Sequence, residues 1–143
     1  MEILARKKKG LGLLYTFTLL MGLILFSLSL FESNKNGVLL LFLSIAALVL
    51  IVASAVIVTQ YLLTPNNAIL YNESENALYV NRNARIYISE IIDLSYTRAT
   101  ARGIQYKWGT VTIITNEKRY VVRYVANCEA VCKKLIDLKY TRG

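Results

Sequence analysis

The chain contains no histidine among its 143 residues. Without an imidazole it can form neither a Ser-His-Asp triad nor a Cys-His pair, the arrangements that most often activate a nucleophilic side chain. Cysteine is also scarce, because Cys128 and Cys132 are the only two. Two thiols without histidine are too few for a usual four-ligand zinc site. We therefore predict a protein that is not an enzyme and that has no metal site and no cofactor.

Charge is absent from two long segments. Leu11–Phe31 and Val38–Leu63 contain no aspartate, glutamate, lysine or arginine. A helix of about 20 apolar residues crosses a bilayer core of roughly 30 Å. We therefore predict a transmembrane helical hairpin over residues 11–63. A secretory signal peptide is the alternative for the first segment, but no small-residue cleavage site follows it and a second apolar segment begins at once.

The charges beside these segments predict the topology. Arg6, Lys7, Lys8 and Lys9 precede the first helix, whereas the connection Glu32–Asn36 has no net charge. Lysine and arginine concentrate on the cytoplasmic side of spanning helices. We therefore expect residues 1–10 to form a basic cytoplasmic leader, the connection to lie outside, and everything after the second helix to be cytoplasmic.

Small residues in the two apolar segments predict how the helices meet. Close approach of membrane helices favours glycine, alanine, serine and threonine at the contact. The residues expected on these stripes are Gly12, Thr16 and Ser27 in the first helix and Gly37, Ser44, Ala47 and Ser54 in the second. The stripes would face each other, or one of them would face a partner protein or a second copy.

The remainder of the chain predicts one small domain. Residues 64–67 include the only proline and are predicted to form a short linker. So short a linker would keep the domain near the membrane. Six segments are rich in β-branched and aromatic residues and are separated by turn signals. They are Ala68–Tyr71, Ala77–Val80, Arg85–Ile88, Ile91–Thr97, Trp108–Thr115 and Arg119–Val125. A helical period then runs from Asn127 to Leu138. We predict an α+β domain over residues 68–143, with antiparallel strands in a partly open barrel that the C-terminal helix closes.

The candidate site lies between the fourth and fifth of these segments, where a long polar loop is predicted from Arg98 to Lys107. Arg98, Arg102 and Lys107 are basic, Tyr106 and Trp108 are aromatic, and no acidic residue interrupts them. Basic and amphipathic aromatic side chains favour the membrane interface. We predict these five residues to bind anionic lipid headgroups or a partner. The alternative is an ordinary solvated loop, and nucleic acid is disfavoured because the domain is tethered and carries seven acidic residues.

Three stretches carry a resemblance to a known family. They are Ala77–Val80 with Arg85–Ile91, Gly109–Thr115, and Val125–Val131. Together with the two-helix anchor, they resemble the bacterial membrane proteins that contain a PH-like (pleckstrin-homology-like) domain, and the resemblance covers Ala68–Leu138. It implies a barrel of six to seven strands with a closing helix, a non-enzymatic role, and a multi-pass protein of the bacterial cell membrane.

The resemblance leaves two roles open. One branch of the family protects producing bacteria against leaderless bacteriocins, which implies an immunity protein whose partner is a membrane-active peptide. The alternative is an adaptor or scaffold that binds a membrane protein partner, and a homo-oligomer also stays open. Phosphoinositide-binding PH domains carry basic residues in the first strand-to-strand loop. We expect Asn72–Asn76 to be that loop, and its two acids and lack of bases disfavour a phosphate site.

Overall fold

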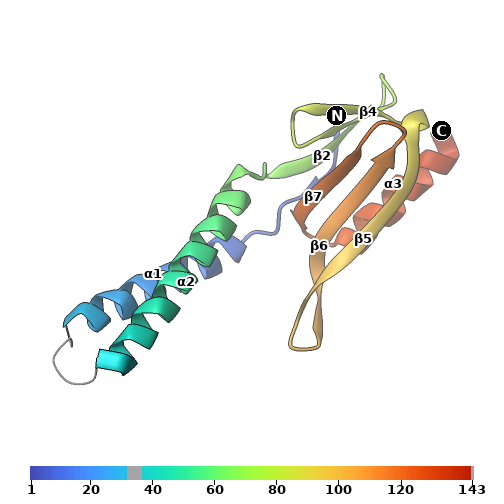
Figure 1. The fold of residues 1–143 in the computed structure, drawn as a ribbon. Helices are drawn as coiled ribbons and strands as arrows, with labels where there is room; N and C mark the ends of the chain where they lie inside the picture. The colour runs from blue at the N-terminus through green and yellow to red at the C-terminus, as the bar shows by residue number, and fades with distance from the viewer. Residues whose placement is uncertain (32–36, 143) are drawn as a thin grey trace. The chain divides into compact units, whose positions relative to one another are not determined.

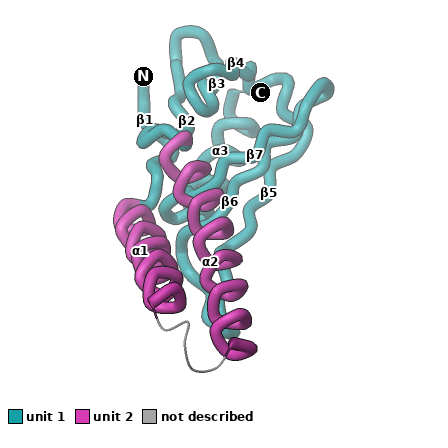
Figure 2. The backbone as a smooth tube through the Cα atoms, turned by 60° about the vertical axis from the view of Figure 1, so that its left-hand side comes forward, with its two compact units in different colours: residues 1–8, 64–143 teal, residues 9–63 magenta. Residues whose placement is uncertain are grey.

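The computed structural model describes residues 1–31 and 37–142 (Figure 1). The connection Glu32–Asn36, expected on the outer side of the membrane, lies outside the described residues. The chain divides into two units (Figure 2). Residues 9–63 form one unit, here called the helical pair, and residues 1–8 with 64–143 form the other, here called the β unit.

The helical pair consists of α1, Leu11–Phe31, and α2, Gly37–Leu63. Both helices are long and apolar enough to span a membrane. Their large apolar side chains point mostly outward, as the exposed fractions of Phe17 (58%) and Phe42 (67%) illustrate. Such exposure is costly in water, where a contiguous apolar surface of this kind usually marks a contact with a membrane or a partner.

Small residues line the contact between α1 and α2, although only part of the predicted stripes is correct. The Ser44 hydroxyl donates a hydrogen bond to the Ser29 hydroxyl (3.1 Å), and Ala47 and Ser54 are buried. Gly22 is buried against α2, where an added Cβ would lie 3.0 Å from the side chain of Ile51. The predicted members Thr16, Ser27 and Gly37 are instead exposed. The two hydroxyls bond to carbonyls of their own helix, which satisfies them without a partner helix.

The described residues of the β unit contain seven strands, in two antiparallel sheets, and a C-terminal helix, which confirms the predicted coarse layout. The first sheet has the order β1 (Glu2–Arg6), β2 (Asn67–Asn72), β3 (Ala77–Val80) and β4 (Ala84–Tyr87). A single 3₁₀ turn, η1 (Ile88–Glu90), leads to the second sheet, which has the order β5 (Ile91–Ala101), β6 (Ile104–Thr115) and β7 (Arg119–Val125). Helix α3, Cys128–Arg142, packs against β5 and β6 (Figure 1).

The N-terminal residues differ from the predicted leader, because Glu2–Arg6 forms β1 and pairs with β2. Leu4 and Ala5 are buried in the core, which explains why this apolar stretch leaves water. The chain then continues along β7, where the Lys8 amide donates to the Tyr124 carbonyl (2.8 Å). The helical pair is therefore inserted between two neighbouring strands of one sheet.

The segment predicted as a polar loop is a β-hairpin. Strands β5 and β6 continue to Ala101 and Ile104, which pair directly and leave Arg102 and Gly103 as the turn. Both turn residues have positive φ, at 49° and 80°. Positive φ at both central positions is the mark of a type I′ turn, whose twist matches that of the flanking strands. The prediction of a loop from Arg98 to Lys107 was therefore wrong.

The core of the β unit lies between the two sheets and α3. Its largest fully buried side chains come from five strands, η1 and the helix: Ile69, Leu78, Val80, Ile86, Ile88, Val111, Ile113, Val122, Val125, Cys128 and Leu135. Cys128 and Cys132 are both buried free thiols. Burial raises the pKa of each thiol, which lowers the fraction of reactive thiolate at neutral pH.

Helix α3 provides a direct test of this core. Leu135 is 1% exposed, so Leu135→Asp places an unpaired carboxylate among apolar side chains. We expect the free energy of unfolding to fall by about 3 kcal/mol or more. Urea unfolding of the full chain in detergent, followed by the fluorescence of Trp108, measures it. Tyr140→Asp is the control, because Tyr140 lies on the same helix and is 84% exposed. Equal stability of the two variants would contradict the packing described for α3.

Candidate functional site on the β5–β6 hairpin

Strand alternation divides the five predicted site residues between two faces of the hairpin. Arg98 pairs with Gly109, which precedes the buried Val111 on the same face of β6. Arg98 and Lys107 both lie toward α3, where they line one pocket. Tyr106 and Trp108 lie together on the other side, with ring centroids 6.2 Å apart, in a stretch where the pairing of β5 with β6 is irregular. The fifth residue, Arg102, is exposed in the turn.

Gly109 explains how the hairpin brings Arg98 to this position. A Cβ at Gly109 would lie 2.1 Å from the carbonyl oxygen of Thr97 and 2.9 Å from the Cα of Arg98. Glycine in a strand often marks such a close approach of a second backbone. The glycine that opens the Gly109–Thr115 stretch is therefore needed for the pairing of β5 with β6 next to Arg98.

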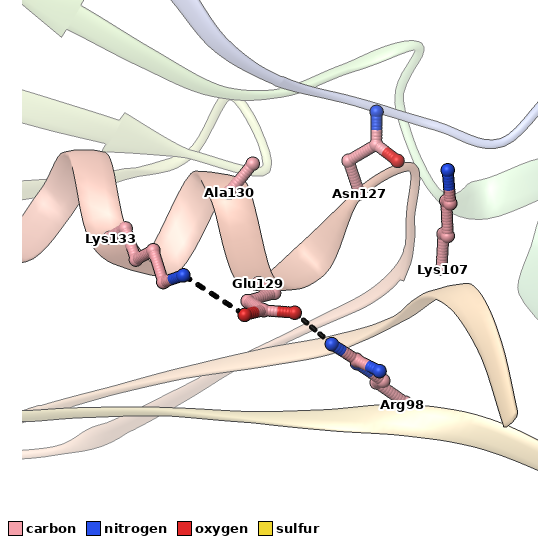
Figure 3. A pocket seen from close by; sticks show the side chains of 6 residues that line it. All are labelled: Arg98, Lys107, Asn127, Glu129, Ala130 and Lys133. Atoms are coloured by element: carbon pink, nitrogen blue, oxygen red, sulfur yellow. Dashed lines mark hydrogen bonds and ion pairs between the residues drawn. The ribbon is translucent and has the colours of Figure 1, made fainter.

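The pocket on the α3 side has a volume of about 260 Å³ (Figure 3). Its lining residues are Arg98, Lys107, Asn127, Glu129, Ala130 and Lys133. The Glu129 carboxylate forms ion pairs with the Arg98 guanidinium and with the Lys133 ammonium, the latter at 3.0 Å. These contacts lower the pKa of Glu129 and raise that of Arg98. Three bases and one acid leave the pocket cationic, although two of the bases share the same carboxylate.

The opposite face carries a row of three neighbouring aromatic rings. The ring centroids of Tyr106 and Trp108 are 6.2 Å apart, and those of Trp108 and Tyr124 are 6.4 Å apart with an interplanar angle of 25°. Pairs in this distance range gain about 1 kcal/mol beyond the burial of their surface. We call Tyr106, Trp108 and Tyr124, with Ile104 at the hairpin end, the aromatic strip.

Tyr124 reaches this strip because β7 departs from regular alternation. Its φ is 58°, and the pairing of β6 with β7 shifts register between Gly109 and Val111. A bulge of this kind redirects one side chain. Val125 consequently joins Val122 in the core, and Tyr124 turns to the other face. A strictly alternating strand would place Tyr124 on the same face as Val122, so the alternation of the sequence alone does not indicate this position.

Six residues of the pocket and the strip were not predicted as site residues: Ile104, Asn127, Ala130, Tyr124, Glu129 and Lys133. The last two were recognisable as a pair, because a glutamate four residues before a lysine places both charges on one helix face. The contact of Glu129 with Arg98 joins α3 to a strand 31 positions earlier. No local pattern in the sequence indicates that contact.

The basic residues expected to set topology also hold the β unit together. Lys7 donates its ammonium to the carbonyl of Thr64 (2.7 Å), and its amide bonds to the carbonyl of Asn66 (2.9 Å). Partial burial lowers the pKa of Lys7. Arg6, Lys8 and Lys9 are exposed. The segments that enter and leave the helical pair are therefore bonded to each other within the β unit.

The loop Asn72–Asn76 was assigned to the wrong position in the strand order. It joins β2 to β3, because β1 precedes the helical pair. Its two acids are paired with bases: Glu73 contacts Arg142, and Glu75 contacts Arg85 at 3.0 Å. Its negative charge therefore stabilises the ends of α3 and β4, and the connection between the first two strands is the helical pair itself.

Comparison of the chain with protein-family models, with curated proteins and with solved structures found no match. Within residues 1–31 and 37–142, no three side chains of the metal-binding types lie together. The cationic pocket and the aromatic strip are therefore the features of the site that indicate a function.

The ion pairs of Glu129 predict a pH dependence. Because its folded-state pKa is lowered, mainly by Lys133 and then by Arg98, this carboxylate stabilises the fold above its ordinary pKa of 4.5. That stabilisation is lost as the pH falls through the lower, folded-state value. We expect Glu129→Gln to be less stable than the parent at pH 7 and to lose less stability on acidification. Melting temperatures of the full chain in detergent between pH 7 and pH 3 measure the difference. Glu117→Gln, in an exposed turn, should follow the parent; a Glu129→Gln curve parallel to that of the parent would show that the ion pairs are not formed.

Proposed function

We propose that the chain is a non-enzymatic integral membrane protein that holds a PH-like domain at the cytoplasmic surface and protects a bacterium against a membrane-active, leaderless-type bacteriocin. The observation that carries this proposal is the insertion of the helical pair between β1 and β2. Protection would take place at the membrane that the peptide attacks, where the helices and the attached domain are both held.

Membrane insertion is supported by the surface of the helices and by the pairing of their flanks. Both helices are free of charge and expose large apolar side chains. Since β1 pairs with β2, both flanks of the helical pair lie on the same side of any membrane it enters. Two crossings satisfy that requirement, and Arg6 with Lys7–Lys9 would place the shared side in the cytoplasm.

The PH-like assignment is supported by the strand arrangement. A four-stranded sheet, a three-stranded sheet and a C-terminal helix enclose one core, as the resemblance implies. The helical pair replaces the first strand-to-strand loop, where phosphoinositide-binding members carry their basic residues. A binding role without lipid-headgroup recognition at that loop fits this arrangement.

The adaptor role is favoured by one observation, the cationic pocket beside α3. Lys107 lines it together with Asn127 at the beginning of the helix. A peptide or protein segment with an acidic side chain would complement these groups, in competition with Glu129. The adaptor would use this pocket and would need no interaction with a bacteriocin.

Topology gives the first test. In intact cells, a membrane-impermeant maleimide should label Ser33→Cys and should leave Asn116→Cys unlabelled, because the first is expected outside and the second inside. The parent is the control for the two native thiols, which are buried. Labelling of Asn116→Cys with protection of Ser33→Cys would reverse the proposed orientation, and with it the cytoplasmic placement of the β unit.

Expression in a bacterium sensitive to a leaderless bacteriocin tests the role itself. We expect the chain to raise the minimal inhibitory concentration of the peptide several-fold and to leave that of a ribosome-directed antibiotic unchanged. Leu135→Asp serves as a control with intact membrane segments and a disrupted β unit. No gain in tolerance from a correctly inserted parent chain would reject immunity and favour the adaptor role.

A further inference from the structure

We infer that the aromatic strip is a membrane-contact surface that rests in the headgroup region of an anionic bilayer. The inference deepens the proposed function and depends on it, because it takes α1 and α2 to span that bilayer. It differs from the prediction made from the sequence by excluding Arg98 and Lys107 from the lipid contact and by including Ile104 and Tyr124.

The composition of the strip matches the membrane interface. Tryptophan and tyrosine concentrate at the boundary between hydrocarbon and water, where the ring is sheltered and its polar group stays hydrated. Ile104 is 60% exposed and Tyr106 is 40% exposed, so the end of the hairpin leaves large apolar surface uncovered. The hairpin end projects beyond β7, since the pairing of β6 with β7 ends at Gly109 (Figure 1). Insertion of this end into lipid would therefore remove apolar surface from water without unpairing a strand.

The charges around the strip favour an anionic surface. Residues 94–116, which cover nearly all of the β5–β6 hairpin, contain no aspartate or glutamate, and neither do residues 118–128, which include β7. Arg102 is exposed in the turn beside Ile104, and Lys8 is bonded to the backbone at the Tyr124 end. Both ends of the strip are thus next to a base. Basic residues at the cytoplasmic leaflet are attracted by anionic lipids over about a Debye length.

Chain connectivity keeps the strip within reach of the membrane. The Lys8 amide donates to the Tyr124 carbonyl at 2.8 Å, and α1 begins three residues later at Leu11. An extended chain covers about 3.5 Å per residue, so Lys8 lies within about 10 Å of the start of α1. The Lys7 ammonium is bonded to the Thr64 carbonyl, directly after the end of α2. The Tyr124 end of the strip is therefore held near both points at which the chain would enter the bilayer.

The other face of the hairpin explains why only one face would contact lipid. Arg98 is occupied by Glu129, and Lys107 lines the polar pocket under α3. The contacts of Trp108 with Tyr106 and Tyr124 hold the three rings together before any contact with lipid is made. Little conformational entropy is then lost when the strip meets the headgroups.

Trp108 makes the inference directly measurable, because it is the only tryptophan in the chain. The full chain is reconstituted in vesicles of phosphatidylcholine with phosphatidylglycerol in a three-to-one ratio, and insertion is verified by resistance to alkaline extraction. We expect a spin label at the lipid headgroup to quench Trp108, and we expect iodide in the buffer to quench it weakly. Vesicles of phosphatidylcholine alone should give less quenching by the headgroup label.

Two exposed isoleucines provide matched variants. Ile104→Asp adds a carboxylate at the end of the strip and should abolish quenching by the lipid label, whereas Ile92→Asp, at an exposed position at the other end of β5, should retain it. An inserted parent whose Trp108 is open to iodide and insensitive to the lipid label would overturn the strip and leave the proposed function standing. A parent that does not insert would overturn both. Protection of Trp108 from iodide that appears only when a soluble protein extract is added, with no quenching by the lipid label, would overturn lipid contact and indicate a protein as the occupant of the strip.

Discussion

The pairing of β1 with β2 is the constraint on which the remaining arrangement depends. It joins Glu2–Arg6 to residues more than 60 positions later, across both long apolar helices. A single backbone hydrogen bond contributes only about 1 kcal/mol net, so the burial of Leu4 and Ala5 is needed to hold so short a strand. Once β1 is in place, its extension along β7 links the two sheets and brings Lys7 to Thr64. The first strand of the β unit therefore precedes the helical pair in the chain, and the other strands follow it.

The β5–β6 hairpin converts a run of basic and aromatic residues into two separate surfaces. One face carries a net positive charge, with Glu129 between Arg98 and Lys133 and with Lys107 beside them. The other carries neighbouring aromatic rings, and Tyr124 is added to them by an irregularity in β7. A strand alternates sides at every residue, so neighbours in the sequence acquire different environments. The chemistry of the site thus follows from its secondary structure as much as from its composition.

The sequence predicted those helices and strands whose pattern of apolar and polar residues lies entirely within the element itself. The absence of charge placed the first helix at Leu11–Phe31, and alternation placed β7 at Arg119–Val125, both with the bounds found in the structure. Strand β1 could not be predicted in this way, because its partner lies beyond the helical pair and its three apolar residues stand beside a basic cluster. The Arg102-Gly103 turn gave only a weak signal, because type I′ hairpin turns favour asparagine, aspartate or glycine before the glycine. Contacts such as that of Arg98 with Glu129 depend on tertiary structure alone.

Hydrogen exchange of the full chain in lipid nanodiscs tests the inserted arrangement most directly. Amides bonded across strands exchange only when the structure opens, whereas those of a leader exchange rapidly. We expect the amides of β1 that bond to β2, and those of Lys7 and Lys8, which bond to Asn66 and to Tyr124 of β7, to exchange as slowly as the amides of residues 67–72. Rapid exchange of residues 3–8 beside a protected β2 would show that β1 is not part of the sheet and would contradict the arrangement.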